Sequence, residues 1–256
     1  MNRWLVLLFG VASYVSFLGV FLYAIGFVGG FLVPTQLDEL ADTGRGEAML
    51  INLGLLAIFA IQHSVMARPR FKRVWTRVIP VAIERSVYVL CTNLALALLF
   101  WQWRPMGVVI WEVDQPLPRM LLWALCASGW LTVLVTTFLI NHFDLFGLRQ
   151  VWCYFRGRHY EPLPFVTPGP YRWVRHPLYV GWLLAFWATP LMTLAHLVFA
   201  LTTTLYILVA IQFEERDLVR HHGDRYREYR RRVPMLVPRW RRPLLIPQTS
   251  TTDHGT

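Results

Sequence analysis

The chain has 256 residues, of which 55% are hydrophobic and only 16% are charged, and its formal net charge is +10. A soluble domain carries roughly a quarter charged residues, so this composition excludes an ordinary soluble protein and indicates an integral membrane protein. The positive residues flank apolar segments, where membrane topology and lipid headgroups account for them, so we expect membrane lipid and no nucleic acid as a partner.

Four apolar segments in the first part of the chain are each long enough to cross a bilayer, which takes about 20 residues. The first of them follows Arg3 and is longer than the apolar core of a secretory signal, about 7–15 residues, so we expect it to be retained. The four spans are predicted at residues 4–33, 48–66, 86–103 and 120–140.

A longer run without formal charge extends over residues 178–213, and Pro190 near its middle disfavours one continuous helix. We predict two short helices that turn near residues 188–195, with both ends of this hairpin at the same membrane surface. The fold class is therefore an all-α polytopic membrane bundle of about four single spans, a C-terminal helical hairpin and a cytoplasmic C-terminal helix. Residues 1–240 form one domain, and residues 241–256 are predicted to be a disordered tail.

The basic residues alternate between the connecting segments. They gather at Arg3, in residues 68–85, in residues 141–177 and in the tail from Glu214, whereas the other two connections are acidic or balanced. The positive-inside rule is satisfied without exception if both termini are cytoplasmic. This topology brings the two ends of the predicted hairpin to the cytoplasmic surface.

Both ends of the hairpin carry residue types that suit a nucleoside cofactor. Arg175 can bind a carboxylate bidentately, and Glu214 and Glu215 can accept hydrogen bonds from an amine or a ribose. Tyr226 and Tyr229 share a face of a helix, and aromatic faces attract cations. Together these groups match S-adenosylmethionine (SAM). Interfacial anchors and a simple helix end use the same residue types, so this alternative stays open.

Two sequence blocks carry a family resemblance. Residues 175–181 read Arg-His-Pro-Leu-Tyr-Val-Gly, and residues 214–218 read Glu-Glu-Arg-Asp-Leu. With Gly223, Tyr226 and Tyr229 they resemble the cofactor signature of the isoprenylcysteine carboxyl methyltransferase-like superfamily. Most of the chain up to residue 238 is similar to the bacterial methanethiol S-methyltransferase branch of that superfamily. The further resembling stretches are residues 23–29, 62–68, 100–105 and 141–150.

The resemblance implies SAM as cofactor, methanethiol as a small volatile thiol substrate, dimethyl sulfide as product and the bacterial inner membrane as location. It also implies a role for Gly181, which would permit close approach of the cofactor. The implied cofactor-binding residues are Arg175, His176, Pro177, Tyr179, Gly181, Glu214, Glu215, Tyr226 and Tyr229.

Methyl transfer to a thiol requires removal of the thiol proton, because the thiolate is the nucleophile. His142 is a candidate base at the cytoplasmic end of the fourth span, and Asp144 can orient it if the helix ends near Asn141, a candidate substrate contact. His63 at the end of the second span is a second candidate base, whereas His196 is expected near the far side of the membrane. Polar helix ends at the headgroups are the alternative interpretation.

The three cysteines are too few and too scattered for a zinc site, and we expect no metal. Other acceptors stay open, namely an isoprenylcysteine carboxylate, a phospholipid amine or another small thiol. A nicotinamide-dependent membrane reductase also shares the Arg-His-Pro-x-Tyr block, and a non-catalytic membrane binding protein is a further alternative. The oligomeric state does not follow from the sequence.

Overall fold

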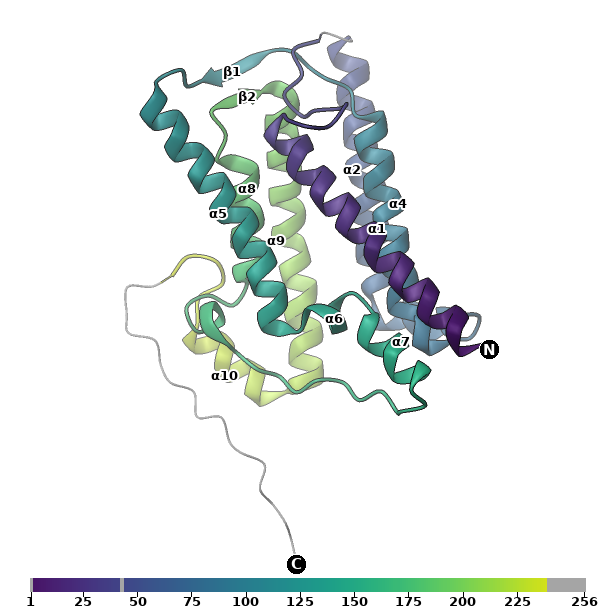
Figure 1. Cartoon of the computed structure of the whole chain (residues 1–256). Helices are drawn as coiled ribbons and strands as arrows, with labels where there is room; N and C mark the ends of the chain where they lie inside the picture. The colour runs from purple at the N-terminus through teal and green to yellow at the C-terminus, as the bar shows by residue number, and fades with distance from the viewer. Residues whose placement is uncertain (1, 42–43, 239–256) are drawn as a thin grey trace, which may run out of the picture.

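The protein is a bundle of long helices with a two-stranded ribbon at one end and several short helices at the other (Figure 1). The structure, a computed structural model, describes residues 2–41 and 44–238; the predicted tail beyond residue 240 lies outside them. Within those ranges, five helices are long and apolar enough to span a membrane, which confirms the predicted all-α membrane bundle. They are α1 (Arg3–Gly29), α2 (Arg45–Ala67), α4 (Glu84–Gln102), α5 (Pro116–Ile140) and α9 (Leu194–His222).

Shorter elements connect the long helices. These elements are α3 (Pro69–Trp75), α6 (His142–Leu145), α7 (Leu148–Phe155), α8 (Pro177–Trp187), α10 (Asp224–Arg232), β1 (Val109–Glu112) and β2 (Leu191–Thr193). Two short 3-10 turns lie at Val81–Ile83 and Gly169–Arg172.

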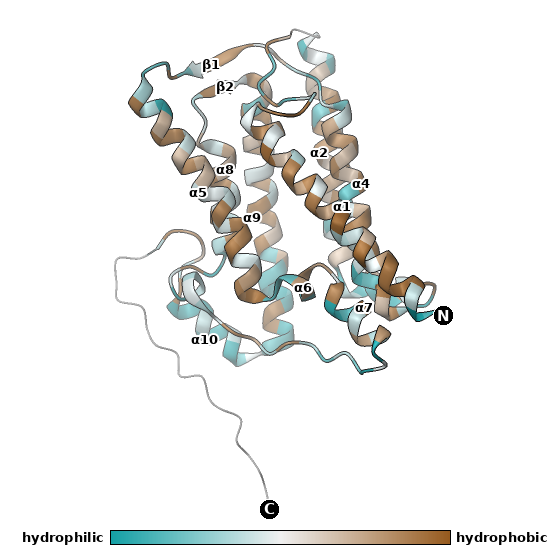
Figure 2. Cartoon of the chain, in the orientation of Figure 1, coloured by the Kyte–Doolittle hydropathy of each residue, from teal (hydrophilic) through white to brown (hydrophobic). Residues whose placement is uncertain are grey.

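The outer faces of the long helices are apolar, as a lipid environment requires. In the most apolar stretch of α1 only 17% of the residues are buried inside the protein, and large side chains such as Leu22 and Leu205 are exposed. Hydrophilic residues gather on α10 and the last turns of α9 (Figure 2). The charged side chains of the site described below therefore lie at one end of the bundle.

The predicted hairpin is present, but its second helix is longer than expected. Pro177 occupies the first turn of α8, where its missing N–H costs no hydrogen bond, and the chain turns between Trp187 and Leu194. The prediction of two short helices ending near residue 213 was wrong, because α9 continues through the charged residues to His222. Gly223, with φ of 56°, then ends α9 and allows α10 to begin.

The ribbon at the opposite end was not predicted. Residues 109–112 were assigned to a loop, but they form β1, which pairs antiparallel with β2 at the tip of the hairpin. The indole of Trp111 also donates a hydrogen bond to the Thr189 carbonyl (3.1 Å). The ribbon therefore fastens the α4–α5 connection to the α8–α9 turn.

A buried acid–imidazole pair stands beside this ribbon. Asp38 accepts hydrogen bonds from the Thr193 amide (3.0 Å) and hydroxyl (2.8 Å), and its second oxygen lies 2.6 Å from Nδ1 of His196. Nε2 of His196 donates to the Phe186 carbonyl (2.8 Å), because a carbonyl oxygen can only accept. His196 is thus hydrogen-bonded through both nitrogens and lies at the end opposite α10, as the sequence analysis expected.

The helices α5 and α8 pack so closely that their backbones touch at two glycines. A Cβ atom at Gly181 would lie 2.8 Å from the Gly129 carbonyl oxygen, and a Cβ atom at Gly129 would lie 2.7 Å from the Gly181 carbonyl oxygen. Gly181 therefore permits close approach of a helix. The expectation that it makes room for the cofactor does not fit this position, which lies outside the cavity described below.

The Gly181→Ala variant is expected to lower the free energy of unfolding by about 1–3 kcal/mol, since the added methyl group can only be accommodated by moving a backbone. Gly54→Ala on α2 is the matched control, because a Cβ there meets nothing within 4 Å. Thermal unfolding in detergent, followed by tryptophan fluorescence, compares the two. Equal midpoints for both variants would contradict the packing argument.

Candidate active site

A cavity of about 1060 Å³ lies inside the bundle and gathers most of the predicted site residues. Pockets for small molecules measure about 300–1,000 Å³, so this one lies at the upper end of that range. Its walls come from α1, α2, α4, α5, α8, α9 and α10 and from residues 160–167. The predicted site residues that line it are His63, Asn141, His142, Asp144, Arg175, His176, Tyr179, Glu214, Tyr226 and Tyr229.

Glu214 presents its carboxylate to the cavity. Its side chain is 44% exposed, and its Oε2 accepts a hydrogen bond from the Tyr179 hydroxyl (3.0 Å). A carboxylate has more lone pairs than this one bond uses. Glu214 can therefore accept hydrogen bonds from an amine or a diol while Tyr179 holds it in place.

Glu215, the second glutamate predicted to contact the cofactor, is turned away from the cavity. It is 5% exposed, does not line the cavity, and accepts hydrogen bonds from Arg175 Nε (2.6 Å) and from His176 Nε2 (3.1 Å). Arg175 also donates to the carbonyls of Val233 (2.6 Å) and Arg230 (3.1 Å). Glu215 thus ties the start of α8 to α9, and Arg175 ties both to the end of α10.

Tyr226 and Tyr229 lie side by side in the wall of the cavity, as their spacing predicted. Their ring centroids are 5.8 Å apart, both residues are buried, and Phe165 packs against the two rings. The Tyr229 hydroxyl donates to the Tyr171 carbonyl (2.5 Å). Burial raises the pKa of both phenols, so they stay protonated at neutral pH and offer uncharged aromatic faces.

His142 is held between two hydroxyl groups. Its Nε2 lies 2.9 Å from the Tyr14 hydroxyl and its Nδ1 lies 2.8 Å from the Thr137 hydroxyl. The ring stacks on Phe138 with a centroid distance of 4.1 Å, and the residue is only 2% exposed. Burial lowers the pKa of His142 below its usual value near 6.5, so the imidazole stays neutral and able to accept a proton.

Asp144 has partners other than the predicted one. As expected, α5 ends at Ile140, but the Asn141 side chain accepts a hydrogen bond from the Asp144 amide (3.0 Å) and so caps α6. The Asp144 carboxylate binds Arg149 (3.1 Å) and accepts from Tyr160 (3.3 Å). The proposed orientation of His142 by Asp144 is therefore replaced by the two hydroxyl contacts of His142.

His63 is a second polar side chain in the wall of the cavity. Its Nε2 lies 2.9 Å from the Tyr88 hydroxyl, and its Nδ1 lies 3.2 Å from the Thr92 hydroxyl. Phe59 stacks on the ring at 5.3 Å. One turn later, Arg68 forms an ion pair with Asp217 of α9 (2.9 Å), which closes α2 onto α9.

The part of the cavity toward the ribbon is apolar. In that part the described lining side chains are uncharged and largely aromatic, with Asn93 and Thr203 as polar exceptions. Such walls suit an uncharged, apolar acceptor and exclude water from it. The apolar lining includes Phe21, Ala24, Leu56, Leu96, Phe100, Trp130 and Phe199.

Tyr14 and Thr137 were missed by the sequence analysis. Tyr14 is separated from His142 by 128 positions, so no local pattern connects them. Thr137 sits in an apolar helix among other threonines, where a hydroxyl usually bonds to its own helix. A weak signal existed at Thr137 alone, since it lies five residues before His142.

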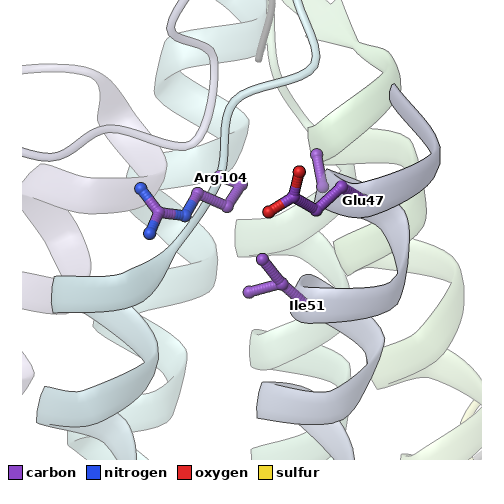
Figure 3. Close-up of a pocket in the computed structure, with 4 residues that line it drawn as sticks. Glu47, Ile51 and Arg104 are labelled. Carbon is purple, nitrogen blue, oxygen red and sulfur yellow. The ribbon is translucent and has the colours of Figure 1, made fainter. Parts of the chain in front are cut away.

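A second, smaller pocket of about 230 Å³ lies near the opposite end of the bundle. Glu47 and Ile51 stand on one side of it and Arg104 on the other (Figure 3). Asn52 of α2 clamps the Arg104 backbone with two hydrogen bonds (2.7 and 2.9 Å). None of the predicted site residues lines this pocket. The described residues also contain no group of three or more His, Cys, Asp or Glu arranged to hold a metal ion.

Comparison with known proteins identifies the family. Residues 120–225 match the family model described as phospholipid methyltransferase. The chain is 58% identical to methanethiol S-methyltransferase of Crocosphaera subtropica over 93% of both chains. It is 57% identical to the protein of the same name from Mycobacterium tuberculosis, over 93% of this chain and 98% of the relative.

A more distant likeness is to nurim of Xenopus laevis, 31% identical over 80% of this chain and 74% of the relative. No solved structure matches the chain. The cavity is lined by an acid, an arginine, tyrosines, a neutral imidazole and apolar side chains. The long matches to bacterial methyltransferases fit this chemistry. The chain belongs to the methanethiol S-methyltransferase family.

Proposed function

We propose that this methyltransferase converts methanethiol to dimethyl sulfide with SAM as methyl donor. The site lies in the bacterial inner membrane and opens to the cytoplasm. The main support is the single cavity that contains both the cofactor-type residues and His142. The names of the bacterial relatives support the substrate. The basic side chains at the α10 end support the orientation, since cytoplasmic segments are rich in arginine.

The residues at the charged end fit SAM. Glu214 offers free acceptor positions for an amine or ribose, and Arg175 lines the same region with a positive charge for a carboxylate. The rings of Tyr226 and Tyr229 offer faces for adenine or for a cation. Pro177 does not line the cavity, so it serves the site by starting α8.

When bound, SAM supplies an electrophilic methyl group on a positively charged sulfur. His142 accepts the proton of the thiol on its unprotonated nitrogen, so the acceptor sulfur reacts as the thiolate. Bound SAM would thus supply the methyl group of the new sulfur–carbon bond, and its own sulfur would leave as an uncharged thioether. The aromatic walls align the small acceptor and exclude water. His63 remains a second candidate base in this proposal.

The Glu214→Gln variant is expected to weaken SAM binding about tenfold to a hundredfold, because a hydrogen bond to a charged group contributes about 1.5–3 kcal/mol. The amide retains a bond to Tyr179, so the fold should be preserved. SAM affinity is measured by calorimetry and dimethyl sulfide by headspace gas chromatography. Glu112→Gln in β1, at the other end of the protein, is the control. Unchanged SAM affinity in Glu214→Gln would contradict the proposed cofactor position.

The size of the cavity favours a second candidate, a bulkier acceptor. At about 1060 Å³ it lies at the upper end of the range for small-molecule pockets. Longer alkyl thiols, an isoprenylcysteine carboxylate and a phospholipid amine therefore belong in the same assay as competitors. The nicotinamide-dependent reductase is set aside, because the relatives that match most of the chain are methyltransferases.

A further inference from the structure

The hydrogen bonds around His142 determine which of its nitrogens carries the proton. The Thr137 hydroxyl donates its own hydrogen to the Leu134 carbonyl (2.7 Å), so its oxygen is free to accept. Nδ1 of His142 lies 2.8 Å from that oxygen. The geometry therefore places a proton on Nδ1, which donates to Thr137.

The contact of the second nitrogen is consistent with this assignment. The Tyr14 hydroxyl lies 2.9 Å from Nε2 of His142, and a phenol that donates its hydrogen needs an unprotonated nitrogen as acceptor. The ring is also confined by aromatic neighbours, namely Phe138 at 4.1 Å and Phe146 at 4.8 Å between centroids. A ring so packed cannot exchange its two nitrogens without moving those side chains.

We propose that Thr137 and Tyr14 are positioning residues: Thr137 holds His142 as the neutral tautomer protonated on Nδ1, and Tyr14 orients the ring through a hydrogen bond to the basic Nε2. This assignment rests on the proposed role of His142 in removing the thiol proton. In that step the proton leaves the thiol sulfur and bonds to Nε2, while Nδ1 keeps its bond to Thr137. The resulting imidazolium then carries both protons, and Thr137 stabilises the charge.

The charged groups near this pair have other partners. Asp144 on α6 faces Arg149 and Tyr160, and the elements that contact the His142 ring contribute aromatic rings and the two hydroxyls. The tautomer of His142 is therefore set by Thr137 and Tyr14. In many enzymes a carboxylate performs this task, and its replacement there leaves the wrong tautomer and a large loss of turnover.

The test observes the tautomer directly in the full-length protein, labelled with ¹⁵N-histidine in detergent micelles without substrate. The chain has eight histidines, and the His142 signals are those that disappear in His142→Gln. We expect one protonated nitrogen, Nδ1, and one hydrogen-bonded, unprotonated Nε2. In Thr137→Val the Nε2-protonated form should appear, whereas Thr137→Ser should keep the wild-type spectrum and Tyr14→Phe should change only the Nε2 shift.

Turnover provides the second readout. Thr137→Val is expected to lower kcat at least about tenfold, and Thr137→Ser should restore most of it, because serine keeps the accepting oxygen. Thr132→Val on the same helix and Tyr23→Phe on α1 are matched controls that remove hydroxyls elsewhere.

A wild-type spectrum with the proton on Nε2 would overturn the proposal, as would equal kcat values for Thr137→Val and Thr137→Ser. The spectrum needs no substrate. A protein with the expected tautomer that makes no dimethyl sulfide would therefore contradict the proposed function and leave the tautomer assignment intact.

Discussion

Replacing His142 with glutamine is expected to lower turnover about 10²–10⁴-fold while SAM binding is largely retained. A positioned general base contributes about this factor, and His142 lines the cavity with one nitrogen able to accept a proton. Headspace dimethyl sulfide and calorimetry with SAM separate the two effects. His159→Gln, an exposed histidine of the following loop, is the control.

The same role of His142 predicts the direction in which kcat/KM changes with pH. Burial lowers the pKa of His142 below about 6.5, so the neutral base persists at a lower pH than for an exposed histidine. The acidic limb of kcat/KM should therefore lie below pH 6.5 in the wild type and vanish in His142→Gln. The buried neutral imidazole also makes the fold less stable as the pH falls below about 6.5, because the unfolded chain then binds more protons. An unchanged acidic limb in His142→Gln would exclude His142 as the titrating base.

The Asp38→Asn variant should lower the free energy of unfolding by about 3–5 kcal/mol. Asp38 contacts His196, which is 0% exposed and hydrogen-bonded through both of its ring nitrogens, and removing one partner of such a buried pair is strongly destabilising. Asp38 also accepts two hydrogen bonds from Thr193 at the start of α9. Chemical denaturation in mixed micelles measures the loss.

The neighbouring Glu39→Gln provides the matched control for Asp38→Asn, because Glu39 is exposed on the same loop. It should leave stability unchanged. Since the Asp38–His196 pair lies at the end of the bundle opposite α10, the residual folded Asp38→Asn protein should keep its affinity for SAM. A variant as stable as Glu39→Gln would show that the pair contributes little to the fold.

The spans were predictable because their lipid-facing surfaces are continuous apolar runs, and the four single spans lie close to their expected positions. Pro177 and Gly223 were also informative, since each acts on the backbone locally. The length of α9 was not predictable in this way. Charge ends a membrane span but does not end a helix, so Glu214 to His222 stay helical beyond the apolar run. The ribbon depends on the pairing of segments far apart in the chain.

The residue types of the candidate site were predicted from the sequence. The contacts between these residues were predicted only in part. Sequence blocks placed Glu214 and Glu215 together, but adjacent helical residues point in different directions, and only Glu214 reaches the cavity. Asp144 seemed a natural partner for His142 because it is near in sequence. Its backbone caps α6 instead and its carboxylate binds Arg149, while α1 supplies Tyr14 from the far end of the chain.

The contact between Gly129 and Gly181 restricts how this family can diverge. Both positions already hold the smallest residue, so an enlargement at one of them cannot be compensated by a reduction at the other. New acceptor preferences can arise more easily on the walls from α1 and α4, where side chains such as Phe21 and Leu96 line the cavity. Evolution of specificity should therefore vary those side chains and leave the glycine contact unchanged.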